Sequence, residues 1–183
     1  MDAQSDRRPM RNTGTLKVTT PSDREVAMTR VFHAPHELVF EAWTKPDLLK
    51  RWLWGPDEWE LAVCEIDLRI GGAFRFVWRQ RDGKANEMGM GGVYRKIVPS
   101  DQLVFTEVWD EDWTGGEALV TILFAEQAGK TTMTQTVLYS SRAARDGALK
   151  TGMEHGAAVS YDRLAELLPS LQARAKEKEA SQS

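Results

Sequence analysis

The stretch "EMGMGGVYRKI" (Glu87–Ile97) places three glycines directly before residues that are typical of a β-strand. Inside a regular element each glycine costs roughly 0.5–1 kcal/mol relative to alanine. A phosphate-binding loop would need these glycines to lead into a helix N-terminus, but they lead into Val93 and Tyr94. The remaining interpretations are a bulge that bends the strand and a missing side chain that leaves room on a concave face. Both predict a curved sheet, with Gly91 and Gly92 beneath a covering helix.

Strands surround this stretch, because apolar residues recur there with a period of two. In Phe74–Arg79 the aromatic residues alternate with Arg75, Val77 and Arg79, which predicts a half-buried strand with its arginines outward. The segment "RDGK" (Arg81–Lys84) is a hairpin signal. Three later runs, "QLVFTEVW", "EALVTILF" and "TTMTQTVLY", are separated by "TGG" and "AGK". Connections this short predict an antiparallel meander.

Helical patterns lie near both ends of the chain. A first strand at about Arg24–Phe32 precedes a helix that starts near Pro35, and a second short helix follows Pro46. A long helix is expected from about Arg142 to Leu168, with Ser140 or Ser141 as its cap.

Pro169 is expected to end this long helix. Its apolar stripe contains Leu149, Met153, Gly156, Ser160, Leu164 and Leu167, widened by Ala157, Tyr161 and Leu168. Four polar residues are expected to lie away from that stripe: Lys150, Glu154, Asp162 and Glu166. Such a helix packs against a sheet, so the chain is assigned to the α+β class.

Composition limits the functions that remain. The 183 residues suffice for one domain, expected over 15–169, between a polar tail (1–14, expected to be disordered) and a charged tail (170–183). The net charge of −3 gives no basic surface for nucleic acid. No apolar run approaches the ~20 residues of a membrane span, and the N-terminus lacks the apolar core of a secretory signal. With Cys64 as the single cysteine, a cytoplasmic location is expected.

Few residues suggest catalysis or metal binding. His33 and His36 lie in "HAPH", but no third ligand is evident, so they are interpreted as surface histidines at a helix start and no metal is expected. Cys64 lies in an apolar strand and is interpreted as a buried, inert thiol. No nucleophile elbow or Ser-His-Asp order is visible, so no catalytic residue is assigned. No cofactor is expected.

Glu107 and Gln135 are the polar residues that are candidates for a binding site. Alternation places Glu107 on one face with Phe105 and Trp109, and a carboxyl in an apolar pocket would anchor a ligand or exchange protons at a raised pKa. Val104, Thr106 and Val108 are equally able to face inward, so the concave face of this strand stays open. The acidic residues 110–112 are interpreted as a solvated hairpin tip, and Trp43 and Trp52 as core.

Four segments of the chain resemble the bacterial branch of the SRPBCC (START-like) superfamily that is named after the activator of the ninety-kilodalton heat-shock chaperone's ATPase. These are "RVFHAPHELVFEAWTKPDLLKRW" (30–52), "DLRIGGAFRF" (67–76), "GGVYRKIVPSDQLVFTE" (91–107) and "GMEHGAAVSYDRLAELL" (152–168). The resemblance implies a helix-grip fold, with a curved antiparallel sheet of about six or seven strands around the last helix. It also implies a cavity for an apolar or amphipathic small molecule, but no particular reaction.

The helix-grip layout and the residue pattern together give a set of predicted ligand-binding residues: Trp54, Phe76, Trp78, Met90, Glu107, Trp109, Gln135, Met153, Ala157 and Tyr161. The resemblance implies a tryptophan at the position of Ala157, so a larger cavity or a shifted mouth is expected. The sequence therefore predicts a binding protein for a small apolar or amphipathic ligand. An enzyme of cyclase or hydrolase type and a chaperone-linked interaction domain are the alternatives.

Overall fold

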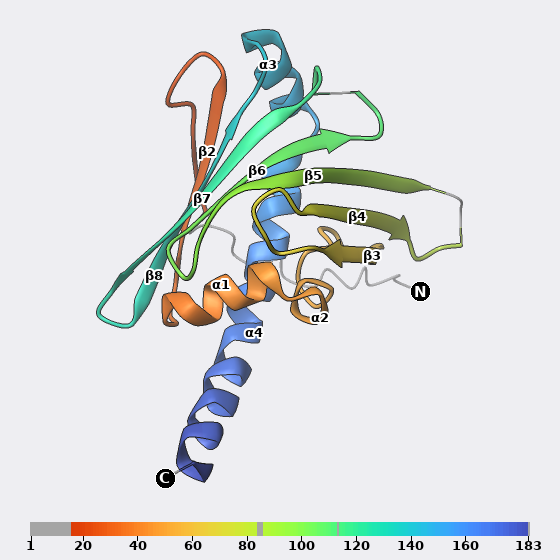
Figure 1. Cartoon of the computed structure of the whole chain (residues 1–183). Helices are drawn as coiled ribbons and strands as arrows, with labels where there is room; N and C mark the ends of the chain where they lie inside the picture. The colour runs from red at the N-terminus through yellow and green to blue at the C-terminus, as the bar shows by residue number, and fades with distance from the viewer. Residues whose placement is uncertain (1–15, 84–85, 113, 183) are drawn as a thin grey trace, which may run out of the picture.

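A curved antiparallel sheet wraps around a long C-terminal helix in the computed structural model, which describes residues 16–83, 86–112 and 114–182 (Figure 1). The sheet has eight strands in the order β1-β2-β8-β7-β6-β5-β4-β3. Their bounds are β1 Lys17–Thr19, β2 Glu25–Phe32, β3 Trp59–Ile66, β4 Ala73–Gln80, β5 Glu87–Val98, β6 Gln102–Trp109, β7 Ala118–Gln127 and β8 Lys130–Leu138. The α+β helix-grip fold is confirmed, with the short strand β1 in addition to the expected strands. The tail expected over residues 1–14 lies outside the described residues.

The helices differ from the expectation at the C-terminal end. Two short helices, α1 (His36–Thr44) and α2 (Pro46–Leu49), follow β2 as expected. The single helix predicted from Arg142 is wrong, because the chain forms α3 (Arg142–Lys150) and α4 (Met153–Ser181) with Gly152 between them in a left-handed conformation (φ 80°). Such a φ interrupts a right-handed helix and suits glycine.

Pro169 does not end α4, which continues to Ser181 and projects beyond the sheet (Figure 1). Proline removes one backbone donor, and a helix can run through it when the surrounding turns are held by packing. Leu168 and Leu171 are both buried on the two sides of this proline and supply that packing. The segment expected to be a charged tail is therefore helical as far as Ser181.

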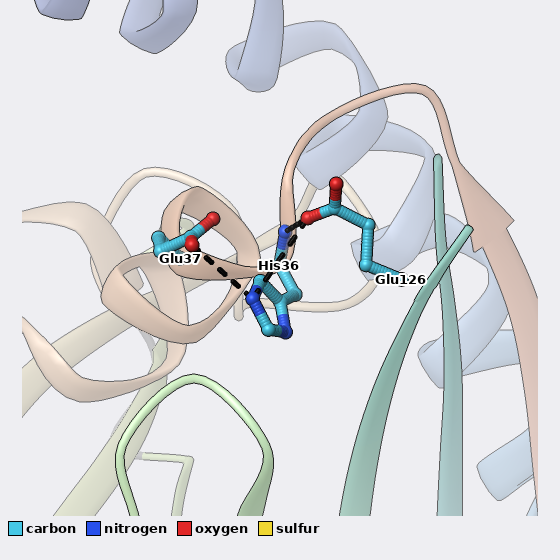
Figure 2. Close-up of side chains that lie close together, drawn as sticks. All are labelled: His36, Glu37 and Glu126. Carbon is cyan, nitrogen blue, oxygen red and sulfur yellow. Dashed lines mark hydrogen bonds and ion pairs between the residues drawn. The ribbon is translucent and has the colours of Figure 1, made fainter. Parts of the chain in front are cut away.

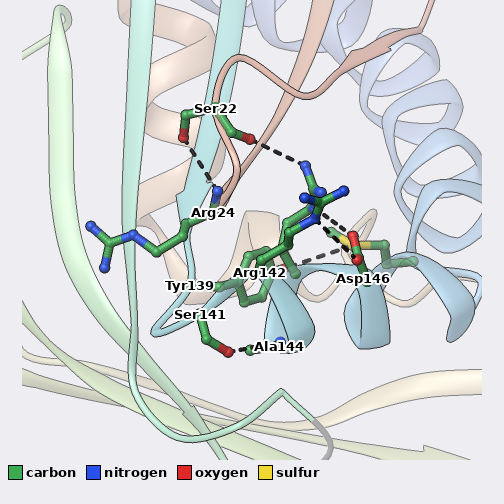
Figure 3. A network of polar contacts seen from close by, with 9 residues as sticks. Ser22, Arg24, Tyr139, Ser141, Arg142, Ala144 and Asp146 are labelled. Carbon is green, nitrogen blue, oxygen red and sulfur yellow. Dashed lines mark hydrogen bonds and ion pairs between the residues drawn. The ribbon is translucent and has the colours of Figure 1, made fainter.

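A polar network fastens α3 to the turn before β2 (Figure 3). Ser141 is the cap, and its hydroxyl accepts a hydrogen bond from the Ala144 backbone N at 3.0 Å. The buried Arg145 donates to the Ser22 carbonyl at 3.1 Å and to Asp146 Oδ1 at 2.8 Å. Charge-assisted bonds of this kind hold the strand-to-helix connection in one geometry.

Tyr161 is the centre of a buried aromatic cluster between α4, α1 and the sheet. Its ring centroid lies 6.2 Å from Phe32, 6.3 Å from Trp43 and 6.2 Å from Trp52. The interpretation of Trp43 and Trp52 as core residues is confirmed by their 8% and 0% exposure.

Asp162 was expected to point away from the sheet, and this expectation is wrong. It is buried and pairs with Arg30 of β2, whose Nη1 lies 2.6 Å from Asp162 Oδ1. Helical periodicity alone could not reveal this, because the partner that makes burial of the carboxylate tolerable lies 132 residues away.

The glycines of β5 are explained by close backbone approach. A Cβ at Gly92 would overlap the carbonyl oxygen of Thr106 on β6, and at Gly91 it would lie 3.1 Å from the Phe74 carbonyl oxygen. The interpretation in which the missing side chain of Gly92 leaves an empty space is therefore wrong. A register shift does bend the strand, but it lies between Tyr94 and Lys96.

Candidate functional site

Strand β6 presents Glu107 to the inner side of the sheet. Leu103 and Phe105 are 1% and 7% exposed, whereas Val108 is 43% exposed, so the odd-numbered residues face α4. Glu107 and Trp109 follow the same alternation. This settles the face that sequence periodicity left open.

The Glu107 carboxyl lies in aromatic surroundings. It keeps some solvent-accessible surface but is enclosed by protein atoms, and this burial raises its pKa from the ordinary value of 4.5. The Trp109 Nε1–H donates to Glu107 Oε1 at 2.9 Å, and this hydrogen bond lowers the pKa of Glu107. Burial also raises the pKa of Tyr139 and Tyr161, and the charge of Glu107 adds to both shifts. These three groups therefore share one electrostatic environment.

Hydrogen bonds join α4 to strand β8 next to this carboxyl. The Tyr161 hydroxyl donates to Gln135 Oε1 at 2.5 Å, so the inward-facing amide of β8 is held by the helix. The Tyr139 hydroxyl lies 3.5 Å from Met153 Sδ at the start of α4. Glu107, Gln135, Tyr139 and Tyr161 together form what we call the inner polar group.

The N-terminal part of α4 covers the sheet loosely. Met153, Gly156 and Ala157 are only half-buried, although Met153 and Ala157 belong to the inward stripe that Tyr161 continues. A Cβ added to Gly156 would meet nothing within 4 Å. Small side chains thus leave space around this end of the helix.

Aromatic and sulfur-containing side chains form the wall beside Glu107. Phe76, Trp78 and Met90 are 7%, 8% and 6% exposed. The Trp78 ring stacks on Trp109 at 5.5 Å, and the Trp78 Nε1–H donates to the Leu53 carbonyl at 2.8 Å. The structure therefore brings the predicted residues of β4, β5, β6, β8 and α4 to one side of the sheet. Their role in ligand binding stays a prediction.

Trp54 lies apart from the inner polar group. It borders a hollow of about 510 Å³, whose other lining residues are Arg51, Asp57, Arg81, Arg163, Glu166 and Leu167. The guanidinium carbons of Arg163 and Arg81 lie 3.2 Å and 4.8 Å from the Trp54 ring centroid. Of the predicted site residues, only Trp54 lines this hollow.

The loop that carries Trp54 is fastened to α4. Gly55 N donates to Ser160 Oγ at 2.9 Å, Arg163 donates to the Gly55 carbonyl, and Arg163 Nη2 bonds to Asp57 Oδ1 at 2.6 Å. Sequence reasoning missed Arg163 and Arg81, because an arginine in a helix or hairpin carries no local signal of a distant loop contact.

The histidine interpretation needs a correction at His36 (Figure 2). The sequence showed no acidic partner, but His36 Nε2 lies 3.2 Å from Glu37 Oε1 and 3.9 Å from Glu126 Oε2, and Nδ1 lies 3.4 Å from Asp101 Oδ1. Glu126 also accepts a hydrogen bond from the His36 backbone N at 3.0 Å, which stabilises the start of α1. Ligand atoms of His36, Glu37 and Glu126 lie within 4.8 Å of one another, but both carboxylates are exposed and already bonded to His36.

Cys64 is buried and unpaired, in agreement with its interpretation as an inert thiol. Burial raises the pKa of this thiol to about 11, so the thiolate is scarcely populated at neutral pH.

A curved antiparallel sheet, closed by a C-terminal helix over an inner face with a few polar groups, defines a START-like protein of the helix-grip class. Residues 33–169 match the family described as "Activator of Hsp90 ATPase homolog 1-like protein". The chain belongs to this family. The search of curated proteins found no match.

Solved structures with the same fold come from several bacteria. A protein from Rhodobacter sphaeroides is 29% identical with a TM-score of 0.79, and the match covers 85% of this chain and 99% of that one. A Nitrosomonas europaea protein is 22% identical with a TM-score of 0.72, covering 84% and 99%. An AHSA1-like protein from Aeromonas hydrophila is 21% identical with a TM-score of 0.60, covering 75% and 91%. No helix of the described chain is both long and apolar enough to cross a membrane.

Proposed function

We propose that this protein binds a small apolar or amphipathic molecule between the N-terminal part of α4 and the inner face of the sheet. The observation that carries the proposal is the Glu107 carboxyl, which lies among Trp109, Tyr139 and Tyr161 beneath a loosely covering helix. A carboxyl in such surroundings costs free energy unless a partner compensates for lost hydration. Trp109 supplies one such partner at Oε1, and a ligand with one polar end would supply a further one.

The chemistry of the inner polar group fits an amphipathic ligand. The raised pKa of Glu107 extends the pH range in which its carboxyl is protonated and donates a hydrogen bond to a carbonyl or hydroxyl oxygen. Gln135 offers an amide nearby, oriented by Tyr161. Burying about 300 Å² of apolar ligand surface would contribute about 7 kcal/mol before the entropic cost of binding. Apolar burial would thus provide the affinity and the polar groups the orientation.

The proposal is tested by filling the space beneath α4. We expect the free energy of unfolding of Ala157→Trp to lie within about 1 kcal/mol of the wild-type value, because the indole enters space that the small side chains leave. Its affinity for an apolar fluorescent probe should fall about tenfold, or 1.4 kcal/mol. His155→Trp is the matched control, since His155 is exposed on the same helix and should leave probe binding unchanged.

Unchanged probe affinity in a stable Ala157→Trp protein would place the ligand elsewhere. A penalty of about 3 kcal/mol would indicate a packed interior at this position and contradict the proposal. Fluorescence titration and urea unfolding of the three proteins give both quantities.

Catalysis is the second candidate. The raised pKa of Glu107 favours it, because a general acid works best when its pKa lies near the ambient pH. Native mass spectrometry of wild type and Glu107→Gln from the original host separates the two. The same ligand mass in both proteins supports binding alone. A heavier or lighter molecule retained only by Glu107→Gln supports turnover of that molecule.

A chaperone-linked role is the third candidate, and the family description, which names an Hsp90 ATPase activator homologue, favours it. The test is the ATPase rate of an Hsp90-type chaperone from the same host with and without this protein. The single buried Cys64 suits the reducing cytoplasm, where we expect the protein to act.

A further inference from the structure

The hollow beside Trp54 joins segments that are distant in the sequence. Its volume of about 510 Å³ lies within the roughly 300–1,000 Å³ that small-molecule sites occupy. The residues that line it come from the connection between α2 and β3, from the turn after β4 and from α4. Those with charged or aromatic side chains are Arg51, Trp54, Asp57, Arg81, Arg163 and Glu166. We call this concavity the arginine hollow.

The aromatic wall of the arginine hollow is fixed in place. The Arg163 guanidinium carbon lies 3.2 Å from the Trp54 ring centroid, and this arginine side chain is only 6% exposed. Arg163 Nη2 also bonds to Asp57 Oδ1 at 2.6 Å, on the loop that follows Trp54. Arg81 is held as well, because its Nε donates to the Trp59 carbonyl at 2.9 Å. A wall held in this way loses little conformational freedom when a ligand binds.

The arginine hollow is electropositive, although the whole chain carries a net charge of −3. Its three arginines and two carboxylates leave one net positive charge. One of these carboxylates, Asp57, is already paired with Arg163. Within the part of the chain that the structure describes, the Arg51 side chain and the Nη atoms of Arg81 donate to no protein oxygen. Two guanidinium groups at the hollow therefore have donors for a ligand.

An organic carboxylate matches these groups. Guanidinium groups bind carboxylates through two parallel hydrogen bonds, and one negative charge balances the single net positive charge. A second negative charge, as on a phosphate monoester, would lie near the Asp57 and Glu166 carboxylates. Trp54 and Leu167 supply apolar surface for the rest of the molecule. The lining thus favours a carboxylate that is attached to an apolar body.

We propose that the arginine hollow binds a small organic monocarboxylate, with Arg51 and Arg81 holding its carboxylate group. The described lining of the hollow contains none of Glu107, Gln135 and Tyr139. This site is therefore distinct from the one proposed above beneath the N-terminal part of α4, and it does not depend on that site.

The test is isothermal titration calorimetry of the full chain with naphthoate, a planar monocarboxylate. We expect wild type to bind naphthoate, and to bind the uncharged naphthamide about tenfold more weakly. Arg51→Gln and Arg81→Gln should each weaken naphthoate binding about fivefold, because each removes one guanidinium group. Arg142→Gln is the matched control, since it removes the same charge from an exposed position on α3 and should leave the affinity unchanged.

Ala157→Trp separates the two sites, because it should leave the affinity for naphthoate at the wild-type value. Naphthoate binding that is lost in Ala157→Trp and kept in the arginine variants would place the carboxylate beneath α4 and overturn the proposal. Equal affinity for naphthoate and naphthamide would overturn it too, as would a wild type that binds neither.

Naphthyl phosphate distinguishes a carboxylate site from a phosphate site. It should bind more weakly than naphthoate, because its second negative charge would face Asp57 and Glu166. Tighter binding of naphthyl phosphate would overturn the assignment to a monocarboxylate. Thermal unfolding verifies the fold of each variant, and Arg51→Gln serves if Arg81→Gln, which loses the bond to the Trp59 carbonyl, does not fold.

Discussion

Helix α4 meets the sheet differently at its two ends. At the Tyr161–Leu168 end, Tyr161, Leu164 and Leu168 are at most 2% exposed, and the Arg30–Asp162 pair is buried with them. At the Met153–Ala157 end the inward residues are half-buried, and the Tyr139 hydroxyl lies 3.5 Å from Met153 Sδ. One helix therefore combines a closed end that holds the fold together with a loose end that carries polar chemistry. The proposed binding and the stability of the fold would then rest largely on different turns of the same element, with Tyr161 belonging to both.

The largest expected effect is at the closed end. Replacing Asp162 by alanine leaves the Arg30 guanidinium buried without its carboxylate, which typically costs about 3–5 kcal/mol. Urea unfolding should report this loss, while Glu154→Ala at an exposed position of the same helix should change stability by less than about 0.5 kcal/mol. A loss below about 1 kcal/mol for Asp162→Ala would mean that the closed end does not depend on this pair.

The next effect concerns Gly92 in the sheet and Gly156 at the loose end of α4. Gly92→Val should destabilise by about 3 kcal/mol, because the side chain would collide with the Thr106 backbone, which cannot move like a flexible side chain. Gly156→Ala is the contrast, since its Cβ meets nothing and alanine favours a helix by up to about 1 kcal/mol. Denaturation midpoints should therefore shift in opposite directions. Equal shifts would contradict the looseness of α4 around Gly156.

The smallest effect is the pH dependence from Glu107. Its pKa is raised in the folded protein, so the native state binds the proton more tightly than the unfolded chain. This contribution to stability is complete below the ordinary value of 4.5 and is lost as pH rises through the folded pKa. Glu107→Gln cannot ionise, so its stability relative to wild type should increase across that window and then level off.

Unfolding free energies of wild type and Glu107→Gln at a series of pH values measure this difference. A constant offset between the two proteins at every pH would show that Glu107 is well hydrated, and that the loose end is simply solvent-exposed.

The predicted site could be read from the sequence only in part. Alternation placed Glu107 on one face of β6 with Phe105 and Trp109. A period of two does not show which of the two faces points inward, so only the position of the covering helix decided the inward face. The hydrogen bond from Tyr161 to Gln135 joins residues that each belonged to the predicted set, yet its existence depends on how α4 crosses β8. Trp54 was predicted as a ligand-binding residue, and the structure places it against Arg163 at a separate hollow.

The sequence by itself determined the element types, the antiparallel meander, a serine cap at position 140 or 141 and the family, because these depend on local periodicity, turn residues and short motifs. The structure then identified Ser141 as the cap. Only the tertiary structure decided the break at Gly152, the continuation of α4 through Pro169, the burial of Asp162 and the acidic surroundings of His36. For Pro169, Asp162 and His36 the outcome depends on packing or contacts between distant segments, whereas the break at Gly152 rests on the left-handed conformation of that glycine. A buried charge is tolerated where a partner of opposite charge lies beside it, and a proline is tolerated inside a helix where packing holds the turns on both sides. Neither condition can be predicted from the neighbouring residues in the sequence.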